Sequence, residues 1–450
     1  MPALAVASMF VLVTVALWSG GTSRVSILAA SVGLGVGAFL ADSNTDLLFG
    51  VTSGQVLVVR ALATGLCLTA AVVSLSTHRA PSNAHAIRPL VIAALYCAVL
   101  LLLSIPVGEG SLLRSVQVAS PVLGCFALIR LGKPRLPLQV LLLVAAGQCA
   151  YALTIGRKYV SIFSGGRLGG IIHPNTLGYL GAVLAVYGVT QLLGTPNGRS
   201  RAAAGSLVLG SMSILASGSR TALASALVGS AVAAIGQRHF RRNPPPELAV
   251  EPDRRKSDNK LRSVLVVGLS TGLVGWLVLL AQREKGFHRA STDSTLTGRS
   301  ELWGALLQRV AERPFTGYGA GALREDSSLI SQVVAEAGWS GGGAHNALLD
   351  ATISGGVLAG LCWLLIVVAL GRRAIQSRGQ GALAPLFALA FVHSFTEAGA
   401  AGFSSAWYVL VALAALATES RAVRDLPREA VRLTKGSVVA DRNNPLSMID

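Results

Sequence analysis

The chain has 450 residues, of which 52% are hydrophobic and only 13% charged, and its mean hydropathy is +0.60. This composition excludes an ordinary soluble protein, because the apolar residues come in blocks of roughly twenty, the length that crosses a bilayer as a helix. The net charge of +17 does not indicate a nucleic-acid partner, because the basic residues lie mostly between the apolar blocks and indicate membrane orientation instead.

In chain order, the apolar blocks predict an all-α, polytopic membrane protein with about twelve or thirteen transmembrane helices. The first block begins with MPALAVA, which lacks the basic residues at the start of a signal peptide, so we expect this block to be a transmembrane span. The predicted spans are residues 2–18, 25–41, 55–75, 89–106, 116–130, 138–155, 176–194, 202–217, 221–236, 263–281, 346–369, 381–397 and 403–418.

A few polar or reactive side chains lie inside the predicted spans. Arg60 lies in the middle of one, where insertion costs about 2.5–3.5 kcal/mol unless the charge is paired or solvated. His393 and Glu397 are four residues apart near the outer end of another, and an ionisable pair there indicates either a functional site or a local ion pair. The cysteines lack metal-ligand spacing and are expected to be small core residues. They are Cys67, Cys97, Cys125, Cys149 and Cys362.

Lys and Arg gather in alternate connections between the spans, which sets the predicted orientation. The basic insert 237–262 and the C-terminus are expected to face the cytoplasm, and the loop 282–344 the outside. The insert has the composition of a flexible linker. The tail 419–450 repeats arginine near helical spacing, which favours a segment lying on anionic headgroups over a site for a partner.

The outer loop 282–344 is expected to be folded, and a polar loop of this length between spans is usually functional. Helical spacing predicts a helix over 300–313, ended by Pro314, and a second one at about 323–337. Glycines 341–343 then let the chain bend. The expected apolar faces are Trp303, Leu306, Leu307 and Val310, and Leu323, Ile330, Val333, Val334 and Ala337.

Four polar clusters fall on the outer face under this topology. Three arginines there run against the charge rule and indicate an anionic partner, and a diphosphate suits their bidentate guanidinium groups. Each signal has an ordinary alternative: a headgroup contact, a turn cap, an ion pair with a loop acid such as Glu301, or an N-cap for the two asparagines. The clusters are Arg167, His173 and Asn175, then Ser219 and Arg220, then Gly298 and Arg299, and finally His345 and Asn346.

The order of motifs RLGGIIHPNTLGYL, SGSRTAL, GRSELW with RPFTGYGAG, and AHNALLDATISGG resembles the O-antigen ligase and O-antigen polymerase-like family over roughly residues 160–400. The resemblance implies a GT-C-type glycosyltransferase that needs no metal ion or other cofactor. It would divide the chain into N-terminal helices 1–155, a catalytic membrane region 156–418 and the tail 419–450.

The resemblance also implies roles for individual residues. Arg220 and Arg299 would hold the diphosphate of a polyprenyl-diphosphate-linked glycan donor, and His345 would be the catalytic base. The acceptor would be a glycan, a lipid or a protein. Candidate substrate-binding residues are Arg167, His173, Asn175, Gly298, Asn346, His393 and Glu397.

The sequence therefore predicts a glycosyltransferase that works on the outer face of the cytoplasmic membrane. An imidazole exchanges its proton near neutral pH, as a base for a sugar hydroxyl must. Two alternatives stay open for His345, which could orient the diphosphate or cap a helix. A polysaccharide flippase or permease is the alternative for the whole chain, although the repeat halves and broken helices typical of transporters are not evident.

Overall fold

The computed structural model describes most of the helical part of the chain. The described residues are 22–41, 53–77, 87–155, 168–169, 172–194, 200–242, 299–338, 343–377, 381–395, 397, 402 and 404–419. The predicted spans 2–18 and 263–281 lie outside them, as do the C-terminal tail after Glu419 and the insert beyond Arg242.

The described part is all-helical and contains no strand. Every predicted span that falls within it coincides with a helix, which confirms the expectation of a polytopic all-α membrane protein. Six helices are long and apolar enough to cross a membrane, namely α2 Thr22–Ala41, α4 Ser53–Thr77, α6 Glu109–Arg130, α7 Leu136–Thr154, α8 Pro174–Gly194 and α16 Ala347–Gln376. The remaining bundle helices are α5 Arg88–Ser104, α9 Ser200–Ser217, α10 Arg220–Arg242, α17 Leu383–Ser394 and α18 Ser405–Leu416.

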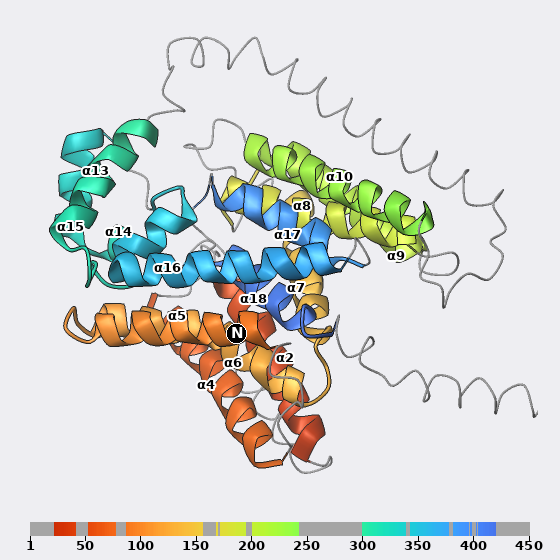
Figure 1. Cartoon of the computed structure of the whole chain (residues 1–450), viewed down its shortest axis with the longest axis horizontal. Coiled ribbons are helices and arrows are strands. Elements are labelled where there is room, and N and C mark those ends of the chain that lie inside the picture. Colours follow the sequence, from red (N-terminus) through yellow and green to blue (C-terminus); the bar gives the residue numbers. More distant parts are fainter. Residues whose placement is uncertain are drawn as a thin grey trace, which may run out of the picture.

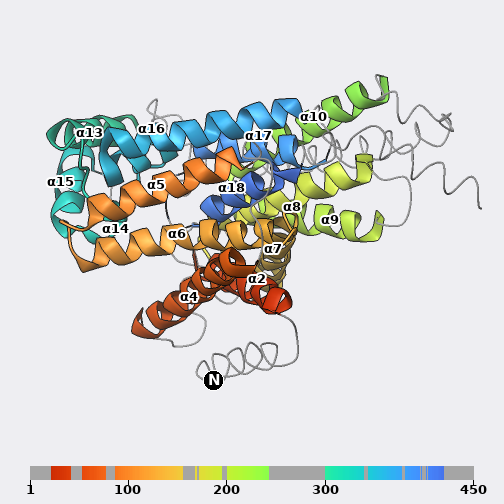
Figure 2. The same ribbon diagram turned by 60° about the horizontal axis from the view of Figure 1, so that its bottom comes forward.

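Helix α18 lies at the centre of the bundle and contacts α5, α6, α7 and α17 (Figures 1 and 2). Its residues from Ser405 to Ala415 are all buried. The Trp407 indole donates a hydrogen bond to the carbonyl of Val118 at 2.8 Å and packs against Tyr96 at 5.3 Å between ring centroids. Helix α18 is therefore held firmly in the bundle.

Small residues bring α8 against both of its neighbours. A Cβ added at Gly181 would lie 2.7 Å from the carbonyl oxygen of Gly210 in α9, a distance that no side chain tolerates. One added at Gly178 would lie 2.7 Å from the Cβ of Ser219, in the turn between α9 and α10. The N-terminal ends of α8 and α10 therefore meet at one end of the bundle.

The bundle accommodates the cysteines and Arg60 within the predicted spans. All five cysteines are buried and free, as expected. The Arg60 side chain donates from Nη2 to the carbonyl oxygen of Leu40 at 2.7 Å, which supplies the partner that the sequence did not identify.

The described part of the loop predicted to face outside, residues 299–338, contains three helices, α13 Arg299–Glu312, α14 Ala322–Glu325 and α15 Ser327–Ala337, which lie together at one end of α16 (Figure 1). They share a small core that also takes in Ala344 and Ile353. In α13 the prediction was wrong about Leu307, which is 59% exposed, while Leu302 is buried in its place. Only a narrow stripe of α13 is buried, and Leu302 and Leu306 are the residues of that stripe that face the small core.

The predicted second helix at 323–337 is two helices, because Asp326 interrupts it. Asp326 adopts an extended conformation and its carboxylate accepts from the backbone N–H groups of Ser328 and Leu329, which makes it the N-cap of α15. The cap resets the register, so Leu329 and Val333 face the small core, and Leu323 does so from α14.

Two glycine motifs dock this loop segment on a kink in α16. The kink lies at Gly355 and Gly356, and Gly356 has a φ of +65°. A Cβ added at Gly317 would lie 2.6 Å from the Gly356 nitrogen, so the two backbones touch directly. The Tyr318 N–H donates to Ile353 O at 2.8 Å and the Val357 N–H to Pro314 O at 2.7 Å. The loop is thus held by main-chain hydrogen bonds at the point where α16 bends.

Candidate active site

A single carboxylate, that of Glu397, joins three of the four polar clusters found in the sequence. Its Oε2 lies 3.0 Å from Nδ1 of His345. Its Oε1 accepts a hydrogen bond from Asn175 Nδ2 at 2.8 Å and lies 3.6 Å from Nη2 of Arg299. The side chains of Glu397, His345 and Arg299 are 13%, 19% and 16% exposed, so this cluster is mostly dry but still open to a ligand.

The surroundings of Glu397 favour its ionised form. Burial raises the pKa of the carboxyl group, but the hydrogen bond from His345 and the interactions with His345, His393 and Arg299 outweigh burial and hold the pKa below its usual value. An ionised carboxylate only accepts hydrogen bonds, so Nδ1 of His345 carries the proton. In the neutral ring the other nitrogen, Nε2, is then the atom that can take a proton.

The local backbone holds His345 in position for this contact. Its φ of +48° places it in the left-handed region, which costs a non-glycine residue about 1 kcal/mol or more. The next residue, Asn346, accepts the Leu349 N–H at 3.1 Å and so caps α16. On the other side, the indole of Trp303 donates to the Ala344 carbonyl at 2.9 Å. The GRSELW and AHN motifs therefore meet directly.

Arg299, the first residue of α13, has capacity for a further ligand. Its ion pair with Glu397 is long, and its buried Nε makes no hydrogen bond within the described part of the chain. The predicted alternative, a pairing of this arginine with an acid, is thus present, but the acid is Glu397 rather than Glu301. A guanidinium group has five N–H donors, so one distant carboxylate oxygen leaves most of these donors available to an anion.

Arg220 lies at the same end of the bundle as this cluster but stands apart from it. It is the first residue of α10, next to the turn that packs against Gly178 of α8, one turn after Asn175. Its side chain is exposed, and no ion pair reaches it among the described residues. The N-terminus of a long helix presents unpaired N–H groups and a positive dipole end, which together with an arginine favour an anion.

Three of the candidate residues have clear structural roles. His173 accepts the Asn175 N–H on its Nδ1 at 3.2 Å at the start of α8. Asn346 is the N-cap of α16. His393 is buried in α17 and stacks on Tyr179 at 4.2 Å between ring centroids. Arg167 and Gly298 lie outside the described residues.

Sequence reasoning found the members of this cluster but not its centre. It related Glu397 to His393, four residues earlier, whereas the carboxylate contacts groups from three distant segments, one of them 222 residues away. Trp303 and Tyr179 were not singled out for the site either. The only signal in the sequence was that an acid stood where a predicted span ends.

The described residues are all-helical and include six helices long and apolar enough to cross a membrane, which indicates a multi-pass membrane protein. Residues 205–364 match the family model described as O-Antigen ligase, and this part of the chain is therefore O-antigen ligase-like. The match confirms the resemblance found in the motifs and supports a membrane glycosyltransferase of polysaccharide biosynthesis. It includes Arg220, Arg299 and His345, whereas Asn175 and Glu397 lie outside it. No curated protein matches the chain.

Proposed function

We propose that this protein transfers a glycan from a polyprenyl-diphosphate carrier to an acceptor hydroxyl on the outer face of the cytoplasmic membrane, with His345 as the general base. The observation that carries the proposal is the 3.0 Å contact between His345 Nδ1 and the ionised Glu397. A carboxylate on one ring nitrogen orients the imidazole and stabilises the imidazolium that forms when the other nitrogen takes a proton.

In the proposed reaction, His345 Nε2 removes the proton from the acceptor hydroxyl as its oxygen attacks the anomeric carbon of the donor sugar. The bond from that carbon to the diphosphate oxygen breaks, and the polyprenyl diphosphate leaves with the electron pair. Arg299 and Arg220 hold the negative charge that grows on the diphosphate, so no acid has to protonate the leaving group. Glu397 is a positioning residue that keeps His345 and Arg299 on the same side of the site.

The charge pattern of two helices supports the orientation in this proposal. Helix α10 begins at Arg220 and ends with Arg238 and Arg242, and α16 begins next to His345 and ends with Arg372 and Arg373. In both, the site lies at the end opposite the basic residues, which by the positive-inside rule belong to the cytoplasm.

Cysteine labelling tests this orientation. On a background without the natural cysteines, an impermeant thiol reagent added from outside is expected to label a cysteine placed at Ser328, which is exposed in α15. A cysteine at Ser257, in the basic insert, should react only after the membrane is opened. The reverse pattern would invert the topology and remove the outer-face site.

Transfer by the purified full-length protein tests the function itself. With a lipid-linked glycan donor and candidate acceptors, we expect a glycosylated acceptor and free polyprenyl diphosphate in equal amounts. A flippase or permease would move the donor across a liposome membrane and leave its sugar–phosphate bond intact. Donor movement without bond cleavage under any acceptor condition would replace this proposal by that one.

A further inference from the structure

An apolar surface on the outside of the bundle runs along α16 and its neighbour α5. On α5, Leu102 and Ile105 are 65% and 61% exposed. Large apolar side chains exposed over several turns of a membrane-length helix form the surface that faces lipid. On α16 the exposed side chains recur at helical spacing and are Val357, Leu358, Leu361, Leu364, Leu365 and Val368.

The turn that follows α13 adds an aromatic side chain to one end of this lipid-facing stripe of α16. Phe315 is 77% exposed. Its backbone lies against the kink, because a Cβ added at Gly356 would lie 2.5 Å from the carbonyl oxygen of Phe315. The next residue of α16, Val357, donates its N–H to Pro314 O and is the first residue of the stripe. The turn thus places the phenyl ring next to the beginning of the stripe.

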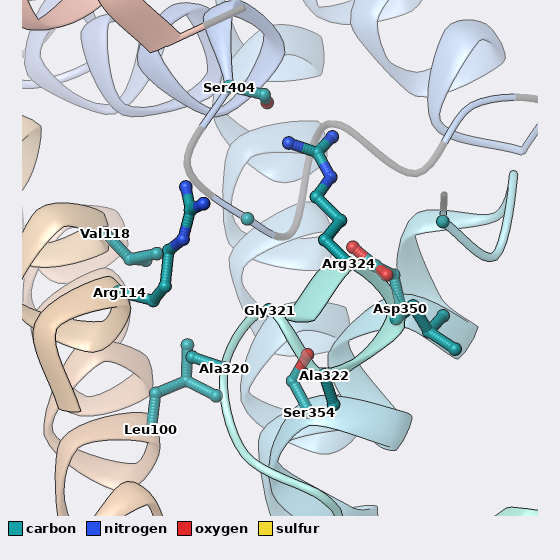
Figure 3. A pocket seen from close by; sticks show the side chains of 13 residues that line it. Leu100, Arg114, Val118, Ala320, Gly321, Ala322, Arg324, Asp350, Ser354 and Ser404 are labelled. Atoms are coloured by element: carbon teal, nitrogen blue, oxygen red, sulfur yellow. The ribbon is translucent and has the colours of Figure 1, made fainter. Parts of the chain in front are cut away.

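The segment that carries Phe315 is held on two sides. Its main-chain hydrogen bonds to the kink of α16 fix one side, and the Ala320 N–H donates to Ser104 Oγ, at the end of α5, at 3.4 Å. Figure 3 shows how the segment continues along a small cavity, with Arg114 of α6 on one side and Asp350 of α16 on the other. The exposure of the ring is therefore a property of the fold and not of a loose loop.

The length of α16 places its kink at one boundary of the hydrocarbon core. The helix has 30 residues and is about 45 Å long, whereas the core is about 30 Å thick. The roughly twenty residues Val357–Gln376 are enough to cross it. They include the basic pair Arg372 and Arg373, which by the positive-inside rule lies near the cytoplasmic boundary. The kink, and Phe315 with it, then lies where the core begins on the opposite side.

The backbone of the turn suits this depth, because irregular backbone near the core must have its polar groups paired. The kink frees the Val357 N–H and the Ile353 carbonyl, and the turn pairs them with the Pro314 carbonyl and the Tyr318 N–H. The exposed Arg313, two residues before the phenyl ring, lies over the ring of Tyr318 at 4.5 Å. A cation beside an exposed aromatic ring fits the membrane interface, where the charge reaches lipid phosphates and the ring reaches acyl chains.

We propose that Phe315 anchors the segment α13–α15 to the outer leaflet of the membrane, with its ring among the phospholipid acyl chains beside Val357. The lipid contact requires only that the chain spans a bilayer, whereas its assignment to the outer leaflet rests on the proposed function. The anchor would hold Arg299, the first residue of α13, near the level of the headgroups, where the diphosphate of a membrane-bound donor lies.

Fluorescence quenching in phospholipid liposomes tests the contact. The full-length protein without its natural cysteines would carry one bimane label, at Phe315→Cys, at Leu361→Cys in the stripe, or at Ser328→Cys, which is exposed in α15. Phospholipids with a nitroxide near the glycerol end of the acyl chain should quench the first two labels about threefold more than the third. Iodide on both sides of the membrane should quench mainly the third. A label at position 315 that behaves like the one at position 328 would overturn the proposal.

Photo-cross-linking gives an independent test with the natural cysteines in place. In phospholipid nanodiscs, p-benzoylphenylalanine at position 315 should form phospholipid adducts, and the same group at position 328 should form few. A cross-link from position 315 to another segment of the chain would show that protein covers the ring and would overturn the proposal. A lipid-linked donor should leave the phospholipid adduct unchanged, and its replacement by a polyprenyl adduct would assign the position to the donor instead. Neither readout requires transfer, so the anchor and the proposed function can fail separately.

Discussion

The two sides of the His345–Glu397 contact are built differently. Glu397 follows α17 and precedes α18, both embedded in the large core of the bundle. Arg299 begins α13, whose buried residues belong to the small core, while His345 lies between Ala344 of that core and Ala347 of the large core and has a positive φ. A fixed acid thus faces an arginine on a less deeply packed helix and a histidine at the junction of the two cores. Substitutions on the loop side should therefore change turnover more than global stability, and those on the bundle side should change both.

Arg299 should show the largest effect on the loop side. Removing the positive charge from a developing diphosphate leaving group costs about a hundredfold or more in turnover, so we expect Arg299→Ala to lose at least that. Lysine keeps the charge but cannot bind two phosphate oxygens at once as the planar guanidinium group does, so Arg299→Lys should recover little of the loss.

Arg309 provides the matched control, because it lies in the same helix and pairs with Glu312 and Glu336 instead. Arg309→Lys should retain turnover. Near-normal transfer by an Arg299→Ala protein that inserts and purifies normally would contradict the diphosphate role.

Glu397 comes next, on the bundle side. Glutamine keeps the shape but does not stabilise an imidazolium, so Glu397→Gln should lower turnover by about tenfold or more with donor affinity largely kept. Glu419→Gln, which removes an acid paired with the exposed Arg135, is the control and should change neither quantity. Equal losses in the two variants would show a general charge effect and not a positioning role.

The same variant has a pH-dependent effect on stability. The pKa of Glu397 is depressed in the folded protein, so its ionised form adds stability above the unfolded value of about 4.5, and this is lost as the pH falls through the lower, folded pKa. The difference in melting temperature between wild type and Glu397→Gln should thus be largest near pH 7 and shrink below pH 4.5. A difference that grows in acid would mean that the pKa is raised instead.

The smallest effect should come from the N-cap of α15. Asp326→Ala removes the side-chain acceptor for the Ser328 and Leu329 N–H groups, which costs about 1 kcal/mol of local stability. Hydrogen exchange of the α15 amides should speed up about fivefold while transfer stays close to normal. Unchanged exchange would show that this cap does not hold α15.

Much of the helical architecture was predictable, because membrane-length apolar blocks admit one structure, and positions such as Arg220, Arg299 and His345 stood out against their surroundings. The helix break at Asp326 was also readable in principle, since an aspartate before two serines is a capping signal. The partner of Glu397 was not readable. A contact across 52 residues to His345 depends on how α8, α13, α16 and α17 meet, and local spacing to His393 suggested a different neighbour.

Separate measurement of donor binding and turnover in His345→Ala and His345→Gln tests the central claim most directly, with His239→Ala, at the exposed end of α10, as the histidine control. The general-base role predicts that turnover falls by about a hundredfold or more, that the donor still binds with nearly wild-type affinity, and that the control behaves as wild type. Donor binding lost with turnover per bound donor unchanged would contradict that role and make His345 part of the diphosphate site.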